Sequence, residues 1–321
     1  MRKMKIKLVI ATALIIIGTI IFIGGMAMSN WNFKALSTRK MQTMEYEIIE
    51  NFTDISIIEN TADVVFEIAD NGKCKVVCYE ETNAAHTVSV EDGALKISVS
   101  DKKTWLDYIG FNFSTPKITV YLPVGAYDKL KIESNTGDVF IPSELKLGSI
   151  DVEINTGGVE CQASATETIR IKTTTGDIKL TNVSADAVDL TVSTGQITAS
   201  GINCAGDISM TVSTGKVLLS DTKCKNLTSS GNTGGITLDG VIATEKLSIN
   251  RTTGDVKLDC SNAGEILIET NTGDVEGTLL SEKIFITHTS TGNVNVPKST
   301  TGGVCEITTT TGDIDISVES R

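Results

Sequence analysis

The chain has 321 residues, of which 40 are Asp or Glu and 28 are Lys or Arg, and its formal net charge is −12 at pH 7. Phosphate backbones repel a chain of this charge, so the composition argues against a nucleic-acid partner. The same charge opposes direct association with anionic lipids or wall polymers unless a cation intervenes.

Residues 1–28 predict a membrane anchor. Four cations among the first seven residues precede an uncharged apolar run from Leu8 to Met28, which is long enough to cross a bilayer. The positive flank should stay in the cytoplasm, so we expect a single-pass protein of the cell membrane with an extracytoplasmic C-terminal part. A signal peptide cleaved near Gly25-Met26-Ala27 is the alternative hypothesis, although the length of the apolar run favours a retained anchor.

Residues 29–44 are polar and aperiodic and predict a short stalk. Residues 45–127 alternate apolar and polar positions, as in Ile55-Ser-Ile57, and contain the hairpin signal Asp92-Gly93. We expect this segment to form a β-rich capping domain, an antiparallel sheet that covers the first coil of the repeats described below. Stacked repeats need such protection at their ends.

Four aromatic residues stand close together within the capping segment. They are Trp105, Tyr108, Phe111 and Phe113. One hypothesis makes them a hydrophobic lid on the first coil, and the other makes them an exposed patch that binds a protein partner or the lipid interface. They are therefore the candidate partner-binding residues.

Residues 128–321 carry a repeat marked by ten Thr-Gly pairs at intervals of 19 or 20 residues. The glycines are Gly137, Gly157, Gly176, Gly195, Gly215, Gly234, Gly254, Gly273, Gly292 and Gly312. A unit this small cannot bury its own apolar face and must stack on its neighbours. Glycine in the turn supplies a positive φ.

Each repeat predicts two short strands, one on either side of the turn. The second residue after every glycine is Val or Ile, and apolar residues alternate before the turn. The chain is therefore expected to be all-β, a parallel β-solenoid of about ten coils behind the β-sheet cap and one transmembrane helix. An antiparallel meander of hairpins is the alternative, but the third stretch of each repeat lacks the alternation that a further hairpin arm needs.

Aspartate often follows the repeat glycine, and stacked carboxylates could bind calcium. The one continuous series is Asp255, Asp274, Asn293 and Asp313. We favour a solvated turn in which Asp makes local hydrogen bonds, and we expect no metal site and no cofactor.

The seven cysteines do not have the paired spacing of zinc ligands. Cys161 and Cys305 occupy positions that other repeats fill with apolar residues, so we expect them in the core. Cys204 and Cys224 belong to a series of small inward residues and lie within disulfide reach in neighbouring coils, although a free pair is favoured.

The membrane segment, the strand Ile118-Thr-Val-Tyr-Leu-Pro123 and the repeated Thr-Gly-Asp turns resemble the bacterial membrane-anchored β-strand-repeat family commonly labelled "putative adhesin", a domain of unknown function. The resemblance covers about residues 45–321. It implies location and class, and it supplies no catalytic residues.

The coils contain few candidate bases or sugar-stacking aromatics, which disfavours a polysaccharide-acting β-helix enzyme. We therefore predict a non-enzymatic extracytoplasmic scaffold, adhesin-like or interacting with the cell envelope, with an unidentified protein or envelope partner. An accessory or sensory subunit of a cell-envelope-stress signalling system is the alternative.

Overall fold

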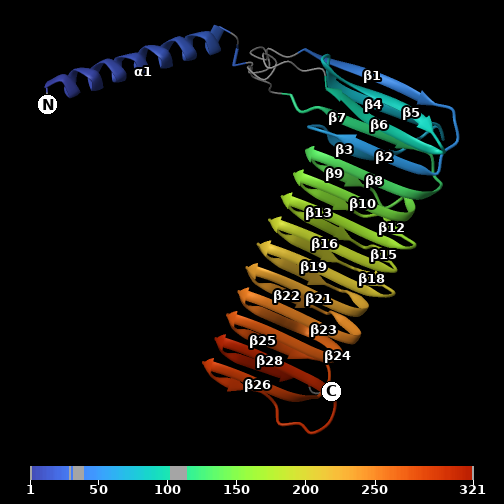
Figure 1. Cartoon of the computed structure of the whole chain (residues 1–321), viewed down its shortest axis with the longest axis vertical. Helices are drawn as coiled ribbons and strands as arrows, with labels where there is room; N and C mark the ends of the chain where they lie inside the picture. The colour runs from blue at the N-terminus through green and yellow to red at the C-terminus, as the bar shows by residue number, and fades with distance from the viewer. Residues whose placement is uncertain (1, 29, 32–39, 102–113, 320–321) are drawn as a thin grey trace.

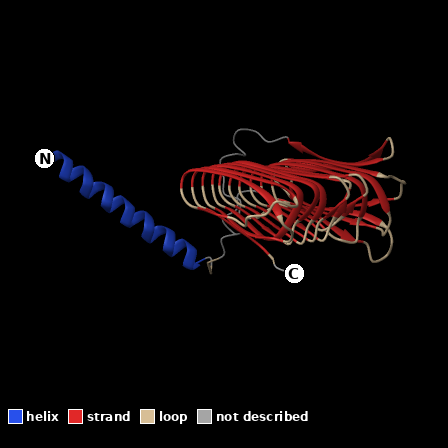
Figure 2. Cartoon of the chain, turned by 90° about the horizontal axis from the view of Figure 1, so that it is seen from below, coloured by secondary structure: helices blue, strands red, loops and turns tan. Residues whose placement is uncertain are grey.

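The fold is described from a computed structural model, in which residues 2–28, 30–31, 40–101 and 114–319 are placed. The helix α1 (Arg2–Met28) is followed by β-strands only, and the strands stack into a rod (Figure 1). Viewed from one end of the rod, the coils overlie one another as flattened loops (Figure 2). The predicted all-β solenoid is confirmed.

Two parallel sheets face each other across the core. The long-strand sheet contains β8 (Ala126–Thr136), β10 (Lys146–Thr156), β13 (Thr168–Thr175), β16 (Ala187–Thr194), β19 (Asp207–Thr214), β21 (Lys223–Thr233), β23 (Ile242–Thr253), β24 (Val256–Thr272), β28 (Gly303–Thr311) and β26 (Lys283–Thr291). The short-strand sheet contains β9 (Val139–Ile141), β11 (Val159–Cys161), β14 (Ile178–Thr181), β17 (Ile197–Ser200), β20 (Val217–Ser220), β22 (Ile236–Asp239), the first residues of β24, β25 (Val275–Leu279), β29 (Ile314–Val318) and β27 (Val294–Asn295).

The looser third side of the coils carries three very short strands. These are β12 (Ser164–Ala165), β15 (Ser184–Ala185) and β18 (Asn203–Cys204). Their inward position is a column of small buried side chains, in which Ala185, Cys204, Cys224 and Ala243 lie next to one another in successive coils. Cys204 and Cys224 are free, and Cys161 and Cys305 are fully buried in the core.

Each Thr-Gly turn joins a long strand to a short strand, and the ten repeat glycines have φ between +121° and +153°. At Gly215 a Cβ atom would clash with the carbonyl oxygen of Gly195 in the preceding coil. Only glycine satisfies both the positive φ and this close approach. The amide of Gly195 in turn donates to the carbonyl oxygen of Thr214 at 3.0 Å, so the turns hydrogen-bond along the stack.

The cap contains β1 (Met41–Ile48), β2 (Asp54–Glu59), β3 (Asp63–Ile68), β4 (Cys74–Glu81), β5 (Ala84–Glu91), β6 (Ala94–Asp101) and β7 (Lys117–Leu122). Strand β2 pairs in parallel with both β6 and β8, and β3 with both β7 and β9. Strands β6 and β7 pair in parallel on one side and antiparallel with β5 and β4 on the other. The expectation of an antiparallel cap is wrong for β2 and β3. It holds for β1, β4 and β5, which pair antiparallel with their neighbours.

Strands β2 and β3 run parallel because they flank a turn that has Ala62 in place of the repeat glycine. The turn Asn60-Thr61-Ala62-Asp63 lies one layer above the turn Asn135-Thr136-Gly137-Asp138. A Cβ atom on Gly137 would clash with the carbonyl oxygen of Ala62, just as a Cβ atom on Gly157 would clash with the carbonyl oxygen of Gly137. The inward pairs also match, because Ile55 aligns with Leu130 and Val64 with Val139. The strands β2 and β3 therefore continue the stack.

The far end of the rod departs from sequence order. Strand β28 lies between β24 and β26, and β29 lies between β25 and β27 (Figure 1). The last coil of the chain, β28 and β29, is therefore the second from the end of the rod, and the coil that precedes it in sequence, β26 and β27, forms the end. Coils that follow one another in the chain are therefore not stacked in chain order at this end. The coil of β28 and β29 has the more apolar interior, with Cys305, Ile307 and Ile314 all at 0 % exposure. The terminal coil has one side open to solvent, and Val294 is 45 % exposed.

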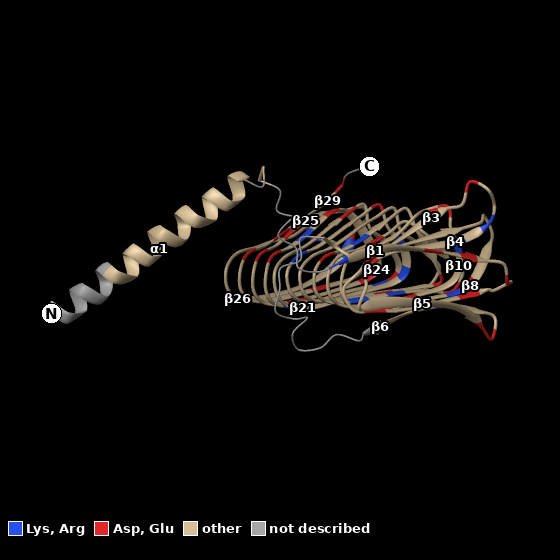
Figure 3. Ribbon diagram, turned by 90° about the horizontal axis from the view of Figure 1, so that it is seen from above, with Lys and Arg blue, Asp and Glu red and all other residues tan. Residues whose placement is uncertain are grey.

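The described chain contains one helix that is long and apolar enough to cross a membrane, Ile10–Met28 of α1. Nearly all side chains of Ile10–Met28 are exposed, and α1 lies toward the cap end of the rod (Figure 1). Figure 3 shows Lys, Arg, Asp and Glu positions of both signs spread along the strands of the rod. Cross-coil pairs such as Lys172 with Glu153 and Lys246 with Glu265 have exposed side chains.

Candidate functional site

The four aromatic candidates, Trp105, Tyr108, Phe111 and Phe113, lie outside the described residues, so the choice between lid and patch stays a prediction. The strands on either side of them are placed. Strand β6 ends at Asp101 and β7 begins at Lys117, both in the outermost parallel layer of the cap.

The aspartate series is assembled at the turns, but in a different order from the sequence. The order in space is Asp255, Asp274, Asp313 and Asn293. The Asp255 carboxylate accepts a hydrogen bond from the amide of Asp274 at 3.0 Å, and the Asp274 carboxylate accepts one from Asp313 at 2.8 Å. Each of these carboxylates therefore accepts a hydrogen bond from the backbone of the next coil and not from its own turn. The same bond joins Asp138 to the amide of Gly158.

A shallow groove of about 400 Å³ crosses the outer face of the short-strand sheet where the cap meets the first coils. Its lining includes the apolar side chains of Val65 and Phe140 and the charged side chains of Lys117, Glu160 and Lys179. Glu160 and Lys179 form an ion pair of 3.1 Å between neighbouring coils. The groove thus combines apolar contact area with charges of both signs.

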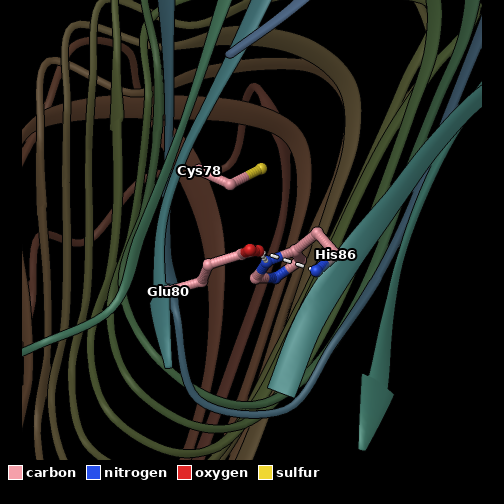
Figure 4. Close-up of side chains that lie close together, drawn as sticks. All are labelled: Cys78, Glu80 and His86. Atoms are coloured by element: carbon pink, nitrogen blue, oxygen red, sulfur yellow. Dashed lines mark hydrogen bonds and ion pairs between the residues drawn. The ribbon is translucent and has the colours of Figure 1, made fainter. Parts of the chain in front are cut away.

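The most unusual chemistry lies inside the cap, in a cluster that sequence analysis missed. His86 lies between two carboxylates: Nε2 is 2.6 Å from Oε2 of Glu59, and Nδ1 is 2.6 Å from Oε2 of Glu80. All three residues are buried, with exposures of 6 % for His86, 4 % for Glu59 and 1 % for Glu80. Figure 4 shows the Glu80 carboxylate against the imidazole, with Cys78 beside it on the same strand.

The cluster forms because the chain crosses from one sheet to the other within a few residues. Strand β4 belongs to the short-strand side and β5 to the long-strand side, so Glu80 and His86 both point into the space between them. The turn at Thr82-Asn83 makes this crossing, and Glu59 arrives from the end of β2. Further bonds hold the carboxylates in place: Gln42 donates to Oε1 of Glu80 at 2.8 Å, and the amide of Thr61 donates to Oε1 of Glu59 at 3.0 Å.

The electrostatics favour a protonated imidazole in this cluster. Burial pushes the pKa of His86 down, but the hydrogen bonds and charges of Glu59 and Glu80 push it further up, so the pKa lies above its usual value. For Glu59, burial raises the pKa, but the bonds to His86 and to the backbone lower it more. Burial, helped by the nearby Glu80 and Glu59 charges, raises the pKa of the Cys78 thiol to about 12.

A family model matches almost all of the chain beyond the stalk. The Toastrack DUF4097 model matches residues 52–212 and 202–321. The chain belongs to the Toastrack DUF4097 family. This confirms the resemblance found in the strand and turn motifs. No curated protein sequence matches the chain.

Several solved structures are similar to this Toastrack protein. A "putative adhesin" from Bacteroides fragilis is 19 % identical, with 88 % of this chain and 99 % of that chain covered and a TM-score of 0.45. A "putative adhesin" from Parabacteroides distasonis is 15 % identical, with 75 % and 98 % covered and a TM-score of 0.48. A "putative lipid binding protein" from the same species is 15 % identical, with 88 % and 98 % covered and a TM-score of 0.43. At these identities the names describe those proteins only.

The signal that could have revealed the cluster in this Toastrack chain is weak but present. Glu80 and Glu81 end a strand whose other inward residues are apolar or Cys, and His86 occupies an inward position of the next strand. A charged residue at an inward position requires a partner. The sequence shows that need, but the partner Glu59 is 27 residues away from His86 and becomes visible only in the fold.

Proposed function

We propose that this protein is a non-enzymatic, membrane-anchored extracytoplasmic scaffold, which presents a rigid β-solenoid to an adhesin-type or cell-envelope partner. The observation that carries the proposal is a rod of hydrogen-bonded coils joined at one end to a helix apolar enough to cross a membrane. Such a rod extends away from the bilayer, and its hydrogen-bonded coils keep the side chains of its outer faces in fixed positions relative to one another.

The outer faces of the coils are suited to binding a large partner. Short polar side chains alternate there with cross-coil ion pairs, such as Glu153 with Lys172 at 2.6 Å and Glu265 with Lys246 at 3.1 Å. Because every coil is hydrogen-bonded to its neighbours, these side chains keep a fixed spacing along the rod. Flat surfaces of this kind suit macromolecules, whereas small-molecule sites are concave.

The burial of the histidine cluster supports a role without catalysis. A general acid or base must come within hydrogen-bond reach of a substrate. His86 and Glu80 are enclosed by the two sheets of the cap and are engaged with each other, so a substrate has no access to them in this conformation.

The alternative function is an accessory or sensory subunit of a cell-envelope-stress system, acting on a membrane partner. The groove beside Phe140 favours it, because this groove lies on the coils nearest the cap, where the anchor helix joins the rod. A partner held in the same membrane would reach this end of the rod first.

The exposed Cys260 provides a test of location in the unmodified chain. In spheroplasts of an expressing bacterium, a membrane-impermeant maleimide should label Cys260, and the intact chain, residues 1–28 included, should sediment with the membranes. Labelling that requires permeabilised cells would refute the extracytoplasmic assignment. A soluble chain that lacks the first residues would show a cleaved signal peptide instead of an anchor.

Photo-crosslinking separates the two functions. A photo-reactive residue at Lys179 tests the groove, and one at the exposed Glu306 tests the distal coils. The scaffold hypothesis expects adducts with envelope components at Glu306. Adducts at Lys179 alone, with an integral membrane protein, would favour the signalling subunit.

A further inference from the structure

The buried cluster in the cap contains the donor atoms of a transition-metal site. The Sγ of Cys78, a carboxylate oxygen of Glu80 and a ring nitrogen of His86 all lie within 4.8 Å of one another, and all three residues are buried. Thiolate, imidazole and carboxylate are the ligand types that proteins use for Zn²⁺. We propose that Cys78, Glu80 and His86 bind a Zn²⁺ ion inside the cap.

The fourth residue of the cluster occupies the position expected of an outer partner. Metal-bound histidines almost always donate their second ring N–H to a carboxylate or carbonyl, which fixes the tautomer. In this cap Nε2 of His86 is 2.6 Å from Oε2 of Glu59, while Nδ1 faces Glu80. Glu59 therefore holds the histidine so that Nδ1 is the ligating nitrogen.

The backbone fixes two of the three ligands relative to each other. Cys78 and Glu80 are two residues apart on β4, so their side chains leave the same face of one strand. The carboxylate of Glu80 is anchored further by Gln42 and by the backbone amide of His86, at 2.8 Å and 2.7 Å. The ligand atoms are therefore already grouped, and the ion can enter once Oε2 of Glu80 and Nδ1 of His86, now 2.6 Å apart, move slightly away from each other.

Metal binding conserves the buried charge. When Zn²⁺ binds, the thiol proton and the Nδ1 proton leave to solvent, and two positive charges enter with the ion. The ion therefore replaces two protons, and the low-dielectric interior takes on no additional net charge.

Cobalt(II) reports directly on thiolate ligation and serves as the probe. The full-length protein in detergent, stripped of metal with a chelator, should bind one Co²⁺ per chain and develop a thiolate-to-cobalt charge-transfer band in the near ultraviolet. Added Zn²⁺ should abolish the band and raise the melting temperature of the protein, because the ion binds the folded state alone.

Cys74 offers a matched control for Cys78. It lies on the same face of the same strand and is also buried, but it is not among the grouped ligands. The band should disappear in Cys78→Ser and persist in Cys74→Ser. In Glu59→Gln the band should persist, with metal affinity lower by about 10-fold to 100-fold, because the outer partner of His86 is weakened.

Two results would overturn the proposal. One is a wild-type protein that shows neither the band nor a shift in melting temperature with Zn²⁺, which would make the cluster a buried ion pair only. The other is a folded Cys78→Ser variant, verified by circular dichroism, that retains the band. The wild-type spectrum decides the matter even if that variant does not fold. Neither result bears on the location or scaffold role proposed above.

Discussion

Arg251 shows at the scale of one residue how the regular stack tolerates an exception. It occupies an inward position with 2 % exposure, and its guanidinium fills the space over Gly231, where a Cβ would clash with Nη1. Nη2 donates to Ser229 at 2.7 Å, but Nε and Nη1 have no hydrogen-bond partner among the described residues. Burial lowers the pKa of this group. A buried, poorly paired charge of this kind reduces stability.

We predict that Arg251→Met stabilises the protein. Methionine keeps an unbranched side chain over Gly231 and removes the desolvated charge, so the free energy of unfolding should rise by about 1–4 kcal/mol. Thermal melting of the full-length protein in detergent measures the change. Arg170→Met, on the exposed outer face of another coil, should leave the melting temperature nearly unchanged. A lower melting temperature in Arg251→Met would show that the guanidinium has a stabilising partner.

At the scale of the element, the Thr-Gly turns stack on one another along the rod, and aspartate carboxylates in these turns form a ladder that connects successive coils. In the series Asp255, Asp274, Asp313 and Asn293, each Asp oxygen that accepts a bond takes it from the backbone amide of the next layer. The sequence located these aspartates at the turns, but it suggested bonds within one turn. The change of partner follows from parallel stacking, which places the amide of the next coil within hydrogen-bond distance of the carboxylate, at 3.0 Å for Asp255 and 2.8 Å for Asp274.

For the aspartate ladder we predict no effect of calcium. Added calcium should leave the melting temperature unchanged, because the Oδ1 atom of each ladder carboxylate already accepts a backbone amide hydrogen bond. Asp274→Ala should lower the free energy of unfolding by about 1 kcal/mol, since the Asp313 amide loses its acceptor. A saturable rise in melting temperature with calcium that vanishes in Asp274→Ala would instead establish a metal site.

The exchanged order of the last two coils predicts which outward residues of β24, β28 and β26 lie close enough to be cross-linked. Glu269 aligns with Thr308, and Thr308 aligns with His288, so Glu269 and His288 are two layers apart. In a Cys260→Ser background, dibromobimane should bridge the pair Glu269→Cys and Thr308→Cys, because adjacent strands are about 4.8 Å apart. It should not bridge Glu269→Cys and His288→Cys. Mass spectrometry of the peptides distinguishes the two, and the opposite pattern would mean that the coils stack in chain order.

At the scale of the whole molecule the protein is a rod whose two ends are built differently from its middle. The cap end buries a polar cluster between β4 and β5, and the far end leaves Val294 and Ile286 45 % and 54 % exposed. Between them, the repeated core residues and turn glycines make each coil a close copy of the next. The two ends therefore differ in chemistry from the middle coils, among which Arg251 is a buried exception.

The sequence alone determined the period, the parallel coils, the turn glycines, the buried Cys161 and the apolar helix. Each of these follows from short-range patterns: a strand alternates every two residues, and a 19-residue or 20-residue unit must stack to bury its apolar face. Only the tertiary structure decided the order of the last two coils, the parallel course of β2 and β3, and the meeting of Glu59, Cys78, Glu80 and His86. Coils with similar apolar positions can stack in more than one order, and the choice depends on which interior packs better between two neighbours. The cluster joins residues from three strands, and no local pattern encodes which distant side chain will face a buried charge.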